Sequence, residues 1–114
     1  MTIEKKIKLY STIGSRATFG LHATEIIKNE KYKDIFFLSA DTSTSAGLDK
    51  LRKFYPKNYV EIGIAEQNMI GVATGKARQG AKVVTTTFSP FQTLRCCEQI
   101  KVNLGYMKEK ITMV

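Results

Sequence analysis

Cysteine and histidine, which build most disulfide frameworks and many metal centres, are almost missing from this sequence. The two cysteines, Cys96 and Cys97, are adjacent in the chain. Neighbouring cysteines cannot easily bridge to each other, so a disulfide scaffold is excluded, and we expect both to pack as small apolar side chains. With one histidine, His22, and no ligand spacing, the chain holds no complete metal site of its own.

Long apolar runs are missing as well. No stretch approaches the length needed to cross a bilayer, and Met1–Tyr10 lacks the apolar core and cleavage pattern of a signal peptide. Hydrophobic content of 43% and charged content of 25% are those of an ordinary globular protein, and 114 residues suffice for one modest domain. We therefore expect a cytoplasmic protein with no membrane partner.

The net charge of +8 raises the question of a nucleic-acid partner. The lysines and arginines are spread along the chain, no aromatic platform is interleaved with them, and no nucleic-acid motif is present. A solvated basic surface is therefore expected, without nucleic-acid binding. Phosphorylated substrates would also suit this charge balance.

Apolar stretches of strand length alternate with helical patterns along the chain. Strands are expected at 35–40, 59–62, 82–87 and 110–114, and helices at 15–29, 48–55, 65–78 and 90–104. This alternation predicts an α/β fold with a mostly parallel sheet flanked by helices. The weakly patterned start is expected to be frayed, which gives an N-terminal lead-in over 1–15 and a domain over 16–114.

Three segments with chemistry-bearing side chains directly follow a predicted strand. They are Asp41, Gly63–Glu66 and Thr87–Phe91. Because ligands of open parallel sheets bind at the carboxyl ends of the strands, these segments are predicted to converge on a site at one edge of the sheet.

The segment Gly63-Ile-Ala-Glu-Gln-Asn-Met69 carries the most specific signal. Glu66 falls in the first turn of a predicted helix, where the helix dipole alone favours a carboxylate. The whole string, however, resembles the signature of the pyrimidine-binding domain of transketolase-type thiamine diphosphate enzymes. The resemblance runs from about Arg16 to the C-terminus, and it implies an incomplete pyrimidine-type thiamine diphosphate-binding fold.

In that family, the glutamate of this string hydrogen-bonds the ring nitrogen N1′ of the cofactor's aminopyrimidine. The resemblance therefore implies that Glu66 is the catalytic residue of this chain. It would act indirectly, by favouring the tautomer in which the cofactor's own exocyclic nitrogen can accept a proton.

A second motif, Thr86 to Ile100, is similar to the family segment in which two aromatic residues three apart line the aminopyrimidine pocket. By position Phe91 would stack on the pyrimidine and Phe88 would help to close the pocket, since a flat heteroaromatic ring needs an apolar face. The alternative is that both are simple core residues. The segment from Phe91 to Ile100 looks most like the separately encoded C-terminal subunits of bacterial transketolases, in which Arg95 is expected to be structural or at an interface.

Three further positions match family residues. Asp41 matches an aspartate that approaches the cofactor across the dimer interface. Ser45 and Arg16 match residues that bind the donor phosphate, a natural role for a guanidinium. For Arg16 and Ser45 a surface or capping role remains an alternative.

The family's diphosphate-binding half, which holds Mg²⁺ (or Ca²⁺), has no counterpart in this sequence. The resemblance therefore implies a fragment or subunit that is inactive alone and needs a diphosphate-binding partner subunit or domain, in a dimer or heterotetramer.

The implied function is transketolase chemistry, the transfer of a two-carbon ketol unit between sugar phosphates. Within the same cofactor class the alternatives are a deoxyxylulose-phosphate synthase and a 2-oxoacid dehydrogenase β-like subunit. Asn68-Met69 favours transketolase, since the synthase usually has histidine after the glutamine. A non-catalytic basic binding module is the alternative from another class, because fold alone implies no function.

Overall fold

The computed structural model describes all residues, 1–114, as alternating helices and strands. The helices are α1 (Ile3–Ile27), α2 (Asp49–Phe54), α3 (Glu66–Arg78), α4 (Ser89–Thr93) and α5 (Cys97–Ile100), with 3₁₀ turns η1 (Glu30–Tyr32) and η2 (Pro56–Asn58) and a π-helical segment η3 (Lys101–Tyr106). The strands are β1 (Ile35–Ser39), β2 (Tyr59–Glu61), β3 (Lys82–Thr86) and β4 (Ile111–Met113).

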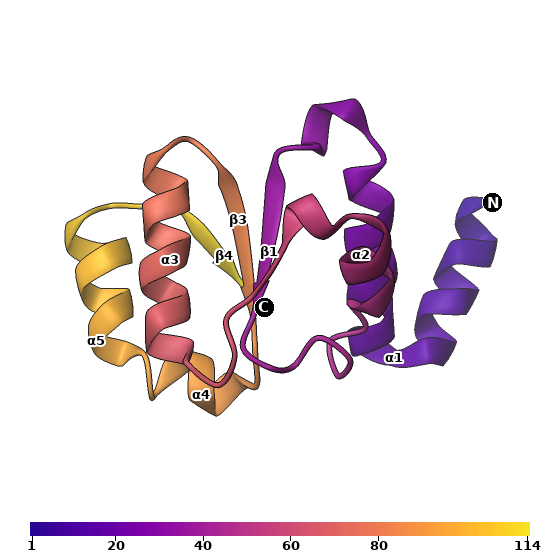
Figure 1. Ribbon diagram of the computed structural model, residues 1–114. Helices are drawn as coiled ribbons and strands as arrows, with labels where there is room; N and C mark the ends of the chain where they lie inside the picture. The colour runs from indigo at the N-terminus through magenta and orange to yellow at the C-terminus, as the bar shows by residue number, and fades with distance from the viewer.

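The four strands form one sheet in the order β2-β1-β3-β4, and every pairing is parallel. The predicted α/β fold with a mostly parallel sheet flanked by helices is therefore confirmed. In the register, Ser39 at the end of β1 lies beside Glu61 of β2 and Thr86 of β3. All strands thus end at the same edge, the lower one in Figure 1, where α3 begins and α4 follows β3.

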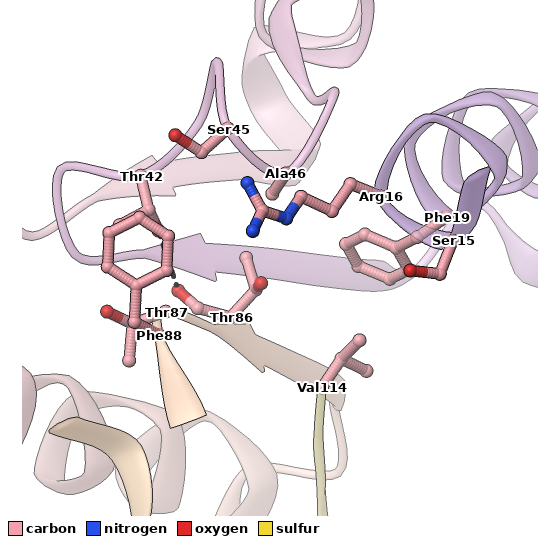
Figure 2. A pocket seen from close by; sticks show the side chains of 10 residues that line it. All are labelled: Ser15, Arg16, Phe19, Thr42, Ser45, Ala46, Thr86, Thr87, Phe88 and Val114. Carbon is pink, nitrogen blue, oxygen red and sulfur yellow. Dashed lines mark hydrogen bonds between the residues drawn. The ribbon is translucent and has the colours of Figure 1, made fainter. Parts of the chain in front are cut away.

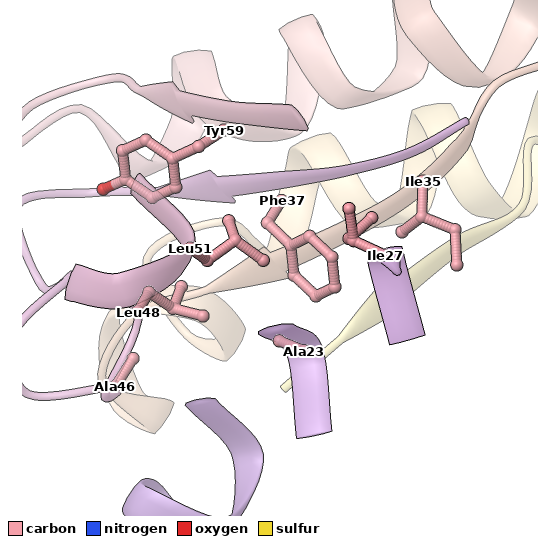
Figure 3. Packing of buried hydrophobic residues seen from close by; sticks show 8 residues of the cluster. All are labelled: Ala23, Ile27, Ile35, Phe37, Ala46, Leu48, Leu51 and Tyr59. Carbon is pink, nitrogen blue, oxygen red and sulfur yellow. The ribbon is translucent and has the colours of Figure 1, made fainter. Parts of the chain in front are cut away.

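Helices cover both faces of the sheet, with α1 and α2 on one side and α3 and α5 on the other (Figure 1). The larger core lies under α1 and α2, where Phe37 of β1 packs among aliphatic side chains that include Leu48 and Leu51 (Figure 3). The smaller core lies under α3, where Met69 packs against Leu38. Because β1 is apolar on both faces, it needs both layers of helices to exclude water.

The N-terminal residues differ from the sequence prediction. They were expected to be frayed, but the chain is helical from Ile3, and the backbone leaves the helical region only at Gly14, with φ of 79°. This residue divides α1 into two segments. Lys6 Nζ lies 3.3 Å from Glu25 Oε2, so the first segment folds back beside the second.

The helix predicted over 90–104 is interrupted, which corrects the prediction. The regular helix stops after Thr93 and resumes at Cys97. Between them, backbone groups of Arg95 form hydrogen bonds other than those of a regular α-helix. The Arg95 carbonyl accepts a hydrogen bond from Gln67 Nε2 at 3.0 Å, and the Arg95 N–H reaches back to Pro90 O. Cys96 is buried at this break, but Cys97 is exposed, so the expectation that both cysteines pack inside is wrong for Cys97.

One close backbone contact positions the loop after β1. Gly20 of α1 packs so tightly against Gly47 that a Cβ built on Gly20 would lie 2.0 Å from the Gly47 carbonyl oxygen. Gly47 itself has a left-handed backbone, with φ of 70°, and a Cβ built on it would lie 3.1 Å from the Arg16 carbonyl oxygen. These glycines therefore fix the distance between the helix that carries Arg16 and the loop that carries Ser45.

No helix of the structure is both long enough and apolar enough to span a bilayer.

We predict that Gly20→Ala destabilises the protein by about 2 kcal/mol or more, because the new methyl group must displace backbone. The urea-unfolding midpoint measures this effect. The matched control is Gly75→Ala in α3, where an added Cβ meets nothing within 4 Å and helix propensity predicts a gain of about 1 kcal/mol. Equal behaviour of the two variants would contradict the close contact.

Candidate functional site

The turns after β1 and β2 are joined by one carboxylate. Glu61, the last residue of β2, accepts the Asp41 N–H on Oε1 at 2.7 Å and the Gly63 N–H on the same oxygen at 3.1 Å. Its other oxygen accepts the Tyr59 hydroxyl at 2.5 Å. Glu61 therefore ties together two of the three segments that were predicted to converge.

The ionisation of Glu61 and Tyr59 follows from this arrangement. Burial by itself raises the pKa of Glu61, but the hydrogen bonds from Tyr59 and from backbone N–H groups more than offset burial, so that the pKa of Glu61 is lowered. Burial, with the hydrogen bond to Glu61, raises the pKa of Tyr59. At neutral pH, Glu61 is therefore a carboxylate that receives hydrogen bonds from three groups.

Glu66 lies in the first turn of α3, as predicted, and is buried, with 4% of its surface exposed. Its Oε2 accepts a hydrogen bond from Arg95 Nη1 at 2.9 Å, and its Oε1 accepts none from the protein. A buried charged group is costly unless it is paired, and Arg95 is the partner of Glu66. One oxygen of Glu66 therefore remains available to a ligand.

Of two aromatic side chains in the segment after β3, Phe91 contacts this ion pair and Phe88 contacts Phe91. The ring centroids of Phe88 and Phe91 are 6.1 Å apart, in an edge-to-face arrangement, and both rings are partly exposed. The Arg95 guanidinium lies 4.1 Å from the centroid of Phe91. Phe91 and Glu66 are thus connected through Arg95, and the alternative that both phenylalanines are simple core residues is not met.

A cavity of about 170 Å³ opens on the other side of Phe88. Arg16 extends from α1 into it, towards Ser45 in the loop after β1 (Figure 2). The rest of the lining is mostly hydroxyl-bearing or apolar: Ser15, Phe19, Thr42, Ala46, Thr86, Thr87, Phe88 and Val114. No aspartate or glutamate lines the cavity, and the Arg16 side chain forms no ion pair, so its charge is available to an anion.

The six residues singled out from the sequence thus fall into two groups and one outlier. Glu66 and Phe91 share a cluster with Arg95, while Arg16, Ser45 and Phe88 share the cavity. Asp41 joins neither group through its side chain, which is exposed; only its backbone N–H is engaged. His22 is exposed.

Two residues of the site were not predicted from the sequence. Glu61 was read only as part of a strand, and Arg95 was expected to be structural or at an interface, without a partner. A signal for Glu61 existed in its position, since the last residue of a parallel strand faces the loops that follow neighbouring strands. The partner of Arg95 follows from tertiary packing of α3 against the segment after α4, which no local pattern indicates.

The fold and this geometry define a class: an open parallel α/β domain that presents a buried carboxylate, an aromatic pair and a free arginine at the carboxyl ends of its strands. A family model described as the transketolase pyrimidine-binding domain matches residues 12–114. The chain therefore belongs to this family, which confirms the resemblance drawn from the sequence.

Individual relatives agree with the family. The chain is 32% identical over 102 residues to one subunit of the apulose-4-phosphate transketolase of Phocaeicola vulgatus, and the match covers 90% of this chain and 32% of that protein. It is 38% identical over 73 residues to 1-deoxy-D-xylulose-5-phosphate synthase of Thermosynechococcus vestitus, where the match covers 64% of this chain and 11% of that protein.

A solved structure described as a split gene transketolase, inactive beta4 tetramer, matches with a TM-score of 0.72 and 30% identity. The match covers 83% of this chain and 31% of that chain. The chain thus spans a third or less of the length of each of these three relatives.

We predict that Arg95→Ala costs about 1–3 kcal/mol of stability, because it leaves the buried Glu66 carboxylate without its partner. The same substitution should cost less in a Glu66→Gln background, since a neutral amide needs less compensation. Urea unfolding of the four proteins of this double-mutant cycle gives the coupling energy directly.

The control for this cycle is Arg78→Ala, which removes an arginine of α3 that forms no ion pair and should change stability by less than about 0.5 kcal/mol. Additive effects of Arg95→Ala and Glu66→Gln would show that the two side chains do not interact in solution.

Proposed function

We propose that this chain is the pyrimidine-binding part of a thiamine diphosphate-dependent transketolase that transfers a two-carbon ketol unit between sugar phosphates. Glu66 is its catalytic residue, and Phe88, Phe91 and Asp41 contribute to cofactor binding. The observation that carries the proposal is the Glu66 carboxylate, which is buried and bound to Arg95 through one oxygen but free at the other.

The residues present fit one half of this cofactor. An aminopyrimidine is flat and carries nitrogens along its edge, so it requires an apolar face and a hydrogen-bonding group in the ring plane. The partly exposed rings of Phe88 and Phe91 offer the face, and the free Oε1 of Glu66 offers the hydrogen-bonding group. When bound, thiamine diphosphate supplies a carbon nucleophile that attacks the carbonyl of the ketose donor.

The task of Glu66 in this proposal is to hold a proton at N1′ of the aminopyrimidine. Arg95 keeps the carboxylate oriented, because its guanidinium is fixed both by the 2.9 Å hydrogen bond and by the ring of Phe91. The low exposure of Glu66 excludes water from this hydrogen bond and so strengthens it.

The hydroxyl-lined cavity is proposed to bind the phosphate of the donor sugar, with Arg16 and Ser45 as its ligands. Support comes from the unpaired Arg16 guanidinium and from the absence of aspartate and glutamate side chains in the lining. An anion entering this cavity meets a positive charge and several hydroxyl donors, the groups that bind phosphate in proteins.

A diphosphate-binding partner subunit or domain completes the proposed enzyme, in a dimer or heterotetramer. The named relatives include one subunit of an apulose-4-phosphate transketolase and a split gene transketolase, which supports this arrangement. No group of three or more His, Cys, Asp or Glu side chains is placed to hold a metal ion here. The proposed ligands of Mg²⁺ (or Ca²⁺) therefore belong to the partner.

The second candidate within the cofactor class is a deoxyxylulose-phosphate synthase, which the Thermosynechococcus vestitus relative favours. The two reactions are distinguished by the donor, a ketose phosphate for the transketolase and a 2-oxoacid for the synthase. An assay that includes both donors therefore separates them.

We predict that Glu66→Gln lowers kcat for ketol transfer by about 100-fold or more, since proton positioning of this kind contributes at least that factor. The assay uses the full natural chain together with its diphosphate-binding partner, thiamine diphosphate and Mg²⁺. Glu98→Gln, at an exposed carboxylate outside the site, is the matched control and should leave kcat unchanged.

Undiminished turnover in Glu66→Gln would contradict the catalytic role. Turnover with a 2-oxoacid but not with a ketose phosphate would replace the transketolase by the synthase. Failure of a well-folded complex to bind the cofactor would favour the non-catalytic binding module.

A separate prediction concerns the anion cavity. Arg16→Ala should raise KM for a sugar-phosphate donor by about tenfold or more, because a charge-assisted hydrogen bond is lost, with little effect on kcat. The control is the same sugar without its phosphate, for which the wild type and the variant should have equal KM. An equal loss with both donors would mean that Arg16 acts on stability and not on the phosphate.

A further inference from the structure

We propose that Glu61 is a positioning residue for the cofactor site, which sets the two turns that carry Asp41 and Glu66 through one carboxylate oxygen. The expected consequence of substituting Glu61, a loss of cofactor affinity, rests on the proposed function. The contacts that carry it are within the chain, and they can be measured independently of any activity.

The geometry of the Glu61 carboxylate is specific to this task. Oε1 accepts hydrogen bonds from two backbone N–H groups that belong to different turns, Asp41 at 2.7 Å and Gly63 at 3.1 Å. The two turns follow neighbouring parallel strands, since Ser39 of β1 lies beside Glu61 in the register. One oxygen atom therefore joins the two turns directly, next to the backbone hydrogen bond in which Ile62 N–H donates to Ser39 O at 2.9 Å.

Both donors have an unusual backbone. Asp41 has φ of 54° and Gly63 has φ of 78°, so each lies in the left-handed region. A non-glycine residue pays for this conformation in steric strain, and it persists only where the surroundings hold it. The Glu61 carboxylate supplies such a restraint at both residues, because it holds the N–H group of each.

The restraint reaches Glu66 through the backbone. Gly63 is fixed by Glu61, the Gly63 carbonyl accepts the Ala65 N–H at 2.8 Å, and Ala65 is the residue before the first turn of α3. Glu66 therefore begins the helix at a position that depends on the turn at Gly63. A shift of this turn would move the free oxygen of Glu66 away from its ligand.

Tyr59 completes the arrangement. Its buried hydroxyl donates to Oε2, which prevents the Glu61 carboxylate from rotating away from the turns. The side chain of Glu61 lines neither the surface around Glu66 nor the Arg16 cavity, so it touches neither proposed ligand site. Its effect on the site is therefore transmitted and not direct.

The test compares three substitutions in the full natural chain, in complex with its diphosphate-binding partner. Glu61→Ala removes the acceptor. Glu61→Gln keeps one oxygen that can accept both N–H groups and is the conservative rescue. Tyr59→Phe removes the hydroxyl but leaves Oε1 in place, and Glu4→Ala, at an exposed glutamate without an ion pair, is the control.

Two measurements are made on each protein. Hydrogen–deuterium exchange, resolved by fragmentation mass spectrometry, reports the protection of the Asp41 and Gly63 amides. Calorimetric titration with thiamine diphosphate in the presence of Mg²⁺ reports the cofactor Kd. Thermal unfolding, followed by circular dichroism, establishes that each variant is folded at the temperature of the experiment.

We expect Glu61→Ala to accelerate exchange at both amides and to raise the cofactor Kd, each by about tenfold or more. Exchange in β3 should stay unchanged. Glu61→Gln should restore most of the protection and affinity, and Tyr59→Phe should lie between Glu61→Ala and the wild type. Amide protection and cofactor affinity in Glu61→Gln therefore show whether a hydrogen-bond acceptor of this geometry suffices at position 61.

Unchanged amide protection in a folded Glu61→Ala protein would overturn the proposal, and so would increased exchange without any change of cofactor Kd. If Glu61→Ala does not fold, Tyr59→Phe takes its place, and its amide protection and cofactor Kd are compared with those of Glu61→Gln by the same criteria. A wild-type complex that binds no thiamine diphosphate would overturn the proposed function and, with it, the consequence for the cofactor. The exchange data alone would then still decide whether Glu61 holds the two turns.

Discussion

The parallel direction of all four strands is the constraint on which the remaining structure depends. It brings every strand end to one edge of the sheet, and it forces each connection to cross a face of the sheet as a helix. The turns after β1, β2 and β3 therefore meet, although Asp41, Gly63 and Phe88 are far apart in the sequence. In a site assembled in this way the turns can move relative to one another, since each turn is attached to a different strand. Contacts between the turns must supply this rigidity, and here they include the Glu61 carboxylate and the Thr42 hydroxyl, which donates to Thr86 O at 3.4 Å.

In the proposed function, the two carboxylates Glu61 and Glu66 at this edge have different tasks. Glu61 receives three hydrogen bonds on its two oxygens, two of them from backbone groups. Glu66 receives one hydrogen bond, from Arg95, on one oxygen only. A carboxylate with donors on both oxygens is suited to hold structure, whereas a buried carboxylate with one free oxygen is costly unless a ligand completes it. The distribution of hydrogen bonds thus separates the two roles without reference to any relative.

The sequence predicted those parts of the fold that follow from local pattern. The apolar run of β1, the alternation of strands and helices and the place of Glu66 in the first turn of α3 all follow from local periodicity. The strand order β2-β1-β3-β4 does not follow from local periodicity, because the alternation of strands and helices predicts parallel strands but not which strands are neighbours. Without the strand order, the hydrogen-bond partners of Glu61 could not be predicted. The break after Thr93 was missed for a similar reason, since the Gln67 amide that takes the Arg95 carbonyl comes from another helix. The helix before Gly14 was missed because its weak apolar pattern gives no face to bury, and Ile3 and Ile7 are indeed exposed.

The aromatic pair separates two positive charges that would otherwise share one pocket. Arg16 lies 5.9 Å from the centroid of Phe88 and Arg95 lies 4.1 Å from the centroid of Phe91, while the two rings contact each other edge to face. Each guanidinium thus has an aromatic surface of its own, a contact worth about 0.5–1 kcal/mol at exposed sites. Arg95 is paired with Glu66, whereas Arg16 is unpaired. In the proposed function, an entering anion is therefore drawn to Arg16 and does not compete with the carboxylate for Arg95. In the proposed function, this separation allows two ligands to bind at the same edge of the sheet. The donor phosphate binds Arg16, and the cofactor binds Glu66 without disturbing its pairing with Arg95.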